Sequence, residues 1–229
     1  MLTAFGPQIW LSDGPVLTAA LGFRYPTRMA VIRLGGGDLV VWSPVALTDT
    51  LRAALAGLGP VGHVIAPNSL HDTFLADWAA AFPQAVLHPA PGIAGAHPDL
   101  TFADTLGDRA PPAWAQEMDQ VVLRSAITDE VVFFHRPSGT VLLTDFIQQV
   151  PAGWHRGWRG LIARLDRMTE ARPTVPRKFR LALRDRDAAK QAARHILSWP
   201  AQRVVMAHGT PVIAEAQEVL RRAFGWLTA

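Results

Sequence analysis

Apolar and polar positions in the first half of the chain follow first a strand period and then a helical one. Two runs rich in apolar residues, 29–34 and 38–42, flank the glycines at 35–37, a pattern that predicts a β-hairpin. Residues 9–11 predict a short strand before it. From Thr48 to Leu58 the apolar positions recur every three or four residues, which predicts a helix that ends at the following Gly-Pro pair.

The next segments alternate strands with helices. Residues 63–66 and 85–88 predict two short buried strands. Between them, a helix beginning near Ser69 is expected to bury one apolar stripe and to expose Asp77. The stripe consists of Phe74, Leu75, Trp78 and Phe82, and Leu70 lies on the same side of the helix. Residues 38–88 therefore read as β-α-β-α-β, which implies crossover connections and helices packed on a sheet.

The second half of the chain also begins with strands and ends with helices. Residues 120–124, 130–135 and 140–144 predict three strands, and the turn sequence 136–139 joins the last two into a hairpin. Helical spacing follows from Trp158 and over residues 188–197. Residues 203–207 predict a final strand, and a closing helix runs through Leu220 and Phe224. Two sheets packed face to face with helices outside, in one domain spanning residues 1–229, account for this order.

Composition limits the chemistry. The chain has no Cys, so any metal must be bound by His, Asp, Glu or an amide oxygen. No apolar run approaches the roughly 18 residues that span a bilayer, and the first 20 residues lack the pattern of a signal peptide. We therefore expect a cytoplasmic protein with no membrane partner, and its oligomeric state stays open.

The charge is unevenly distributed. Residues 155–203 contain 13 Lys or Arg and four acidic residues, whereas the whole chain has a net charge of +3. Such an excess is typical of an anion-binding surface. It is also typical of arginine-rich helices with a solvated outer face, the interpretation we favour here.

Polar residues that could carry chemistry follow several predicted strands. Asn68, His71 and Asp72 lie at a strand-to-helix junction, while Asp145 and His208 each follow an apolar strand. Strand ends of this kind are frequent ligand sites. Taken singly, Asn68 is also a good helix cap and Asp72 suits the positive end of a helix dipole. Their combination is what favours a site.

These segments together resemble a known family. The junction APNSLHDTF, the hairpin EVVFFHRPSGTVLLTD and the late strand RVVMAHG are similar to an uncharacterised branch of the metallo-β-lactamase superfamily. The resemblance extends from about Ile9 to the C-terminus and implies a four-layer αββα sandwich. It further implies that Asn68, Asp72, Asp145 and His208 surround one cavity at the same edge of the sheets.

The resemblance also implies that the first metal position of the superfamily is lost. Catalytic members carry the pattern H-x-H-x-D-H at this junction. Aligned without gaps, Asn68, Leu70 and Thr73 replace its three His residues, and residues 125–127 stand where a later His is expected. His71 falls on an unmatched position, and a shift of one residue would bring it inward.

The second metal position is better preserved. Asp72, Asp145 and His208 match the superfamily's two Asp residues and its last His. Two carboxylates and one imidazole would hold a single divalent ion such as zinc, manganese or iron. The resemblance therefore implies Asp72 and Asp145 as catalytic residues, each able to act as both metal ligand and proton acceptor.

Two further polar residues mark the ends of the predicted strand 130–135. With a period of two, Glu130 and His135 face opposite sides of the sheet. The resemblance makes both of them additional site candidates. For His135 we favour a structural role in the hairpin, and the role of Glu130 stays open.

Two functions compete. The first is a single-metal hydrolase acting on an ester or phosphoester, with an anionic small-molecule substrate held by the arginine-rich segment 172–194. The second is a binding or scaffold module that has lost its metal and its catalysis. Nucleic-acid binding is a lesser variant supported only by the arginine excess.

Overall fold

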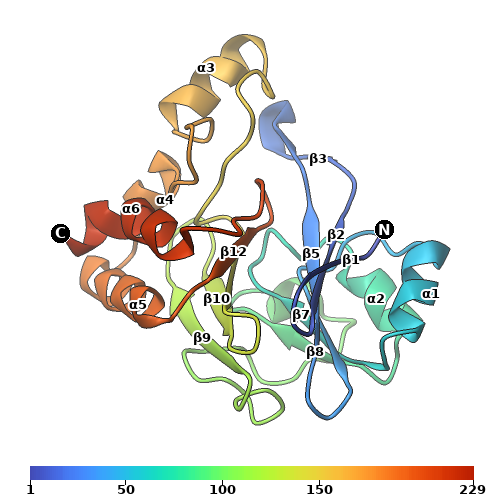
Figure 1. Cartoon of the computed structure of the whole chain (residues 1–229). Coiled ribbons are helices and arrows are strands. Elements are labelled where there is room, and N and C mark those ends of the chain that lie inside the picture. Colours follow the sequence, from blue (N-terminus) through green and yellow to red (C-terminus); the bar gives the residue numbers. More distant parts are fainter.

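The chain forms two β-sheets packed face to face with helices on both outer sides (Figure 1), in a computed structural model that describes residues 1–229. One large buried cluster contains apolar side chains of both sheets, among them Val31 and Val64 of the first and Phe133 and Leu142 of the second. The four-layer αββα arrangement predicted from the sequence is confirmed.

The first sheet is built from the first half of the chain. Its six strands are, in spatial order, β1 (Thr3–Gly6), β2 (Ile9–Asp13), β5 (Arg28–Arg33), β6 (Leu39–Trp42), β7 (Val61–Ala66) and β8 (Val86–Pro89). Pairing is antiparallel from β1 to β6 and parallel from β6 to β8. The parallel pairs arise because helices connect these strands, as predicted.

The second sheet has four strands. In spatial order they are β12 (Arg203–Met206), β11 (Thr140–Leu143), β10 (Glu130–His135) and β9 (Met118–Leu123). Pairing is parallel between β11 and β12 and antiparallel elsewhere. Alternate residues of β10 face the two sides: Val131 and Phe133 join the core between the sheets, whereas Val132 and Phe134 join the core under the outer helices.

Helices cover the outer face of each sheet. α1 (Asp49–Ala56) and α2 (Leu75–Ala81) lie on the first sheet, and α5 (Arg186–Ser198) and α6 (Ala216–Thr228) lie on the second (Figure 1). α1 begins where predicted, because the Thr48 hydroxyl accepts a hydrogen bond from the Leu51 N–H at 3.2 Å. No helix combines the length and the apolar character needed to cross a bilayer.

The helix expected from Ser69 begins six residues later than predicted. Residues after Asn68 form turns, in which the Asn68 side-chain oxygen accepts from the Leu70 N–H at 2.7 Å. Leu75 and Trp78 are fully buried as expected and Asp77 is exposed, but Phe74 and Phe82 are only half-buried and Leu70 is 49% exposed. The prediction failed because the local asparagine turn competes with helix initiation.

Short elements gather at one end of the sandwich. They are β3 (Leu17–Thr18), β4 (Arg24–Tyr25), α3 (Gly157–Leu165) and α4 (Arg177–Leu181), with single 3-10 turns at Ala20–Gly22 and Ala94–Ala96. The helix expected from Trp158 stops at Leu165, before Met168, because Arg167 has a φ of +67°. The sequence did not predict the β3–β4 hairpin or α4, yet both border the cavity described next.

Candidate metal centre

Two pairs of parallel strands place their carboxyl ends at one edge of the sandwich. In the first sheet, Ser43 follows β6 and His71 lies in the turns after β7. In the second sheet, Asp145 follows β11 and His208 follows β12. Arg28 links the two sheets here, because its guanidinium donates to the Met206 carbonyl at 2.9 Å. Segments far apart in sequence therefore meet at this edge.

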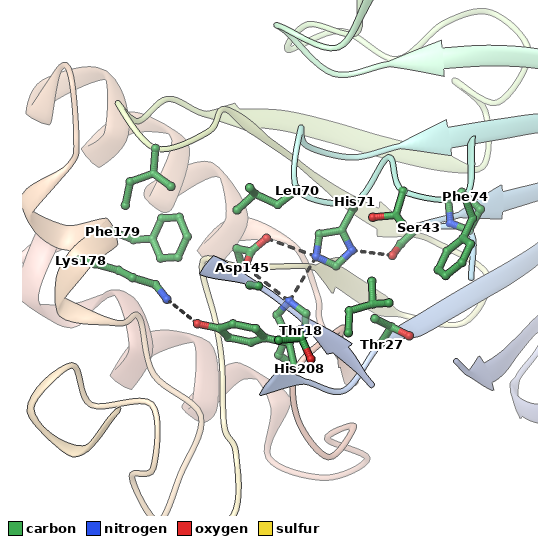
Figure 2. Close-up of a pocket in the computed structure, with 16 residues that line it drawn as sticks. Thr18, Thr27, Ser43, Leu70, His71, Phe74, Asp145, Lys178, Phe179 and His208 are labelled. Atoms are coloured by element: carbon green, nitrogen blue, oxygen red, sulfur yellow. Dashed lines mark hydrogen bonds and ion pairs between the residues drawn. The ribbon is translucent and has the colours of Figure 1, made fainter. Parts of the chain in front are cut away.

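His71, Asp145 and His208 point toward one another and are all buried (Figure 2). His71 Nε2 lies 3.2 Å from Asp145 Oδ2 and 3.3 Å from His208 Nε2. His208 Nε2 lies 3.5 Å from Asp145 Oδ1. These three residues are close enough together to bind one metal ion, and we call them the His-Asp-His cluster.

The proton of the His208 ring is located by its neighbour. Nδ1 lies 2.7 Å from the carbonyl oxygen of Pro26, which can only accept a hydrogen bond. Nδ1 therefore carries a proton. Nε2 is the ring nitrogen that faces the cluster and could bind a metal ion.

The same argument applies to His71 through one additional hydroxyl. Ser43 Oγ donates to the Arg28 carbonyl at 3.1 Å, so it accepts from His71 Nδ1 at 2.8 Å. Ser43 has a φ of +54°, a conformation costly for a residue with a side chain, and this turn aims the hydroxyl at His71. Burial lowers the pKa of His71, so its ring is neutral and its Nε2 lone pair also faces the cluster.

Amide groups orient the Asp145 carboxylate from behind. Asn68 Nδ2 donates to Oδ2 at 2.8 Å, and Gln148 Nε2 donates to Oδ1 at 3.1 Å. Both amides donate hydrogen bonds to the carboxylate, and donors of this kind favour its ionised form.

The cluster consequently presents only acceptors to its centre. Two imidazole lone pairs and an ionised carboxylate lie within 3.5 Å of one another with no hydrogen between them. A cation among these acceptors would stabilise such an arrangement. The separations fit a metal ion, because two ligands each about 2.0–2.1 Å from a tetrahedral ion lie about 3.3 Å apart. The donor set therefore fits a divalent metal ion.

Glu130 supports the cluster from within the second sheet. Its fully buried carboxylate accepts the N–H groups of Thr144 and Asp145, each at 2.7 Å, and that of Phe146 at 3.1 Å. Burial and the charge of Asp145 raise the pKa of Glu130 to about 7, and the backbone donors oppose this rise. Glu130 thus fixes the turn that presents Asp145 and does not itself line the cavity.

The structure corrects the predicted position of Asp72. Its carboxylate lies 2.8 Å from His97 Nε2 and outside the His-Asp-His cluster. His71 takes the place in the cluster that the gap-free alignment assigned to Asp72. The sequence did not predict Ser43, which is hydrogen-bonded to the His71 ring, or Gln148, which donates to Asp145. Neither residue belongs to a recognisable motif.

The remaining predicted residues do not rebuild a second metal position. Asn68 turns its oxygen to the Leu70 N–H and its NH₂ to Asp145, so the amide supports the carboxylate and offers no ligand atom. Leu70 and Thr73 line the cavity without ligand atoms suited to zinc. His135 lies at the far end of β10, where Nδ1 bonds Ser138 Oγ at 2.7 Å.

A cavity of about 310 Å³ opens in front of the cluster, and its walls are largely apolar (Figure 2). Asp145 is its single acidic residue and Lys178 its single Lys or Arg. Lys178 Nζ lies 3.2 Å from the Tyr25 hydroxyl and 3.7 Å from the Asp166 carboxylate. The apolar walls include Leu17, Phe74, Ile127 and Phe179. The cavity has the size and composition of a small-molecule site.

Comparison with solved structures identifies the class of fold. The chain aligns with a metallo-β-lactamase from Pontibacter korlensis at 12% identity and a TM-score of 0.61, covering 99% of this chain and 98% of that one. The metallo-β-lactamase FIM-1 from Pseudomonas aeruginosa, in its mono-zinc form, aligns at 14% identity and a TM-score of 0.62. This alignment covers 100% of this chain and 96% of that one. The metal-soaked flavodiiron core Flv1 from Synechocystis sp. PCC6803 aligns at 13% identity and a TM-score of 0.66. This alignment covers 100% of this chain and 60% of that one. The protein has the metallo-β-lactamase fold.

The family is given by the sequence itself. Residues 8–156, more than half of the chain, match the family described as a domain of unknown function, DUF4336. The chain belongs to this family. None of the curated proteins compared with it matches the sequence.

Proposed function

We propose that this protein is a hydrolase that uses one divalent metal ion bound by His71, Asp145 and His208. The observation that carries the proposal is the convergence of two imidazole lone pairs and an ionised carboxylate at the floor of a cavity. Two imidazoles and one carboxylate suit zinc, manganese or iron(II). The mono-zinc form of FIM-1, another protein of this fold, supports the use of a single ion.

A bound ion of this kind would polarise an ester or phosphoester oxygen and lower the pKa of a water molecule. Asp145 is the one acid of the cavity, so it serves as both ligand and proton acceptor. The predicted catalytic role of Asp72 is not retained, because its carboxylate is paired with His97 outside the cavity.

The rest of the cavity indicates the substrate. Lys178 provides one positive charge, and its contact with Tyr25 places that charge on the same wall as His208, whose ring centre is 5.1 Å from that of Tyr25. The apolar walls would hold the uncharged part of a small molecule. We therefore propose a small substrate with one anionic group beside an apolar body, hydrolysed in the cytoplasm, the location expected from the sequence.

Hydrolysis assays with matched variants test this proposal. Protein reconstituted with zinc, manganese or iron(II) is assayed on a panel of aryl esters and phosphoesters, before and after chelation. We expect metal-dependent turnover that Asp145→Asn reduces by a factor of about 100 or more, in the range found for catalytic groups. Asp72→Asn should retain this turnover, whereas its loss in that variant would favour the role that the sequence assigned to Asp72.

The alternative is a binding module without catalysis. Its support is specific: the resemblance expects a His ligand at position 68, and the Asn68 amide there supports Asp145 and offers no ligand atom. A protein that binds a metal ion and a small molecule but hydrolyses nothing in the panel would favour this alternative.

A further inference from the structure

A second cavity, of about 350 Å³, lies on the helical side of the molecule, and four of its nine lining residues are arginines. Arg167, Arg172, Arg180 and Arg222 contribute to its wall, together with Glu170 and Trp226. They come from the loop between α3 and α4, from α4, and from α6. The four guanidinium groups exceed the single carboxylate by three charges. Three of the 13 Lys or Arg residues in the segment 155–203 therefore line this cavity. Of the segment 172–194, only Lys178 and Phe179 reach the cavity of the His-Asp-His cluster.

The positive charge of this cavity is only partly neutralised by the protein. Arg167 pairs with Glu170 at 3.0 Å, and Arg222 pairs with Glu218 at 3.3 Å. Arg172 and Arg180 form no ion pair. Two guanidinium groups in one cavity are therefore available to an external anion.

Arg180 is held in a fixed orientation. Its Nε donates to the Val175 carbonyl at 2.9 Å and its Nη2 to Thr174 Oγ1 at 3.0 Å, whereas Nη1 has no partner in the protein. The guanidinium lies over the Trp226 ring, 4.9 Å from its centre. Burial, together with the charges of Arg167 and Arg177, lowers the pKa of Arg180, as expected for a cation that faces other cations. A preordered guanidinium loses little entropy when it binds an anion.

We propose that this arginine cavity binds a small phosphate-bearing anion. A phosphate group carries nearly two negative charges at neutral pH and three acceptor oxygens, so it can engage Arg172 and Arg180 together. A single carboxylate carries one charge and leaves one of these arginines uncompensated. The cavity volume accommodates a phosphate or diphosphate with part of an attached group.

The position of the arginine cavity connects it to the candidate metal centre. α4 presents Lys178 and Phe179 to the first cavity and Arg180 to the arginine cavity. Thr174, in the wall of the arginine cavity, exchanges two backbone hydrogen bonds with Gln148, at 3.0 and 3.2 Å. Gln148 in turn donates to Asp145. An anion bound by Arg180 therefore contacts the segment that forms one wall of the first cavity.

Calorimetric titration with inorganic phosphate and with pyrophosphate tests the proposal. We expect pyrophosphate to bind more tightly than phosphate, and acetate at the same ionic strength to bind least. Arg172→Gln should weaken pyrophosphate binding by at least about tenfold, because it removes one charge-assisted contact. Arg180→Lys should also weaken binding, since it keeps the charge but loses the planar fork. Arg221→Gln is the matched control, because Arg221 is also on α6 and paired with Glu218 but does not line the cavity.

Two further measurements separate this proposal from the proposed function. The titration is repeated in the double variant His71→Ala/His208→Ala, in which binding should persist because the arginine cavity does not include those residues. Hydrogen exchange over residues 172–182 should slow when pyrophosphate is added to the wild-type protein. Binding that disappears in the double variant, or that survives Arg172→Gln but is lost in Arg221→Gln, would overturn the proposal, as would no binding at millimolar pyrophosphate.

Discussion

The two ends of β10 both bury polar side chains, but they satisfy them in different ways. At one end, Glu130 accepts hydrogen bonds from the backbone N–H groups of residues 144–146. The network beyond it comes from four separate segments of the chain, represented by Ser43, His71, Asp145 and His208. At the other end, His135 donates to Ser138, and Ser138 donates to Thr140 at 2.7 Å, all within one hairpin. The second network is local and complete in the hairpin, except for His135 Nε2.

This difference separates a structural network from a functional one. A local polar chain forms as soon as its hairpin forms and requires no external partner. The network at the Glu130 end brings together residues as distant as Ser43 and His208, and it still leaves an uncompensated group of acceptors at its centre. Burying acceptors without a donor costs free energy. The cation that we propose would satisfy these acceptors.

The largest expected effect on stability is at the Glu130 end. Glu130→Ala removes the acceptor of three backbone N–H groups and leaves them buried. We expect the free energy of unfolding to fall by about 3 kcal/mol or more. Glu130→Gln keeps an acceptor oxygen of the same shape and should cost less. Denaturant unfolding of both variants measures the difference, and equal losses would show that the hydrogen bonds are not what Glu130 contributes.

At the His135 end a smaller and pH-dependent effect is expected. Burial lowers the pKa of His135 to about 4, so the folded state keeps the ring neutral while the unfolded chain takes up a proton below its ordinary pKa of 6.5. Stability is therefore unaffected above pH 6.5 and is lost as the pH falls from 6.5 toward 4. His135 should account for about 2 kcal/mol of the loss at pH 4.5.

The variant His135→Asn isolates this contribution, because its amide can still donate to Ser138. Unfolding is measured at pH 7 and pH 4.5 in both proteins. The wild type should lose about 2 kcal/mol more than the variant between these pH values. The same acid sensitivity in both proteins would show that His135 titrates normally in the folded state.

The smallest expected effect is a change in metal affinity, which should differ between variants at the two ends of β10. Ser43→Ala removes the hydroxyl that orients the His71 ring, and it should weaken metal binding by roughly tenfold, the effect usual for groups behind a ligand. Ser138→Ala removes the matching hydroxyl beside His135 and should leave metal affinity unchanged. Competition titrations with a chromogenic chelator compare the two, and equal losses would remove the distinction between the ends of β10.

Much of the fold was predictable because its signals are local. The glycine turn at 35–37, the Thr48 cap and the alternation in β10 each fix an element from neighbouring residues. The late start of α2 was not predictable in this way, since the Asn68 turn replaces helix that the apolar spacing favours. The hairpin β3–β4 was missed because each of its strands has only two residues.

The candidate site was predictable in part. Asp145 and His208 follow apolar strands and were correctly placed at one sheet edge. The exchange of His71 for Asp72 depends on turn geometry, which a gap-free alignment cannot represent. Ser43, Gln148 and Lys178 were missed because they act through tertiary contacts between distant segments.

The metal content of the purified protein tests the central claim most directly. Protein prepared without chelators is supplied with zinc, manganese or iron(II), desalted and analysed by native mass spectrometry and elemental analysis. We predict close to one ion per chain in the wild type and in Asp72→Asn, and none in the folded double variant Asp145→Asn/His208→Ala. A wild-type protein that retains none of the three metals would contradict the account, and two tightly bound ions would show that a second metal position exists.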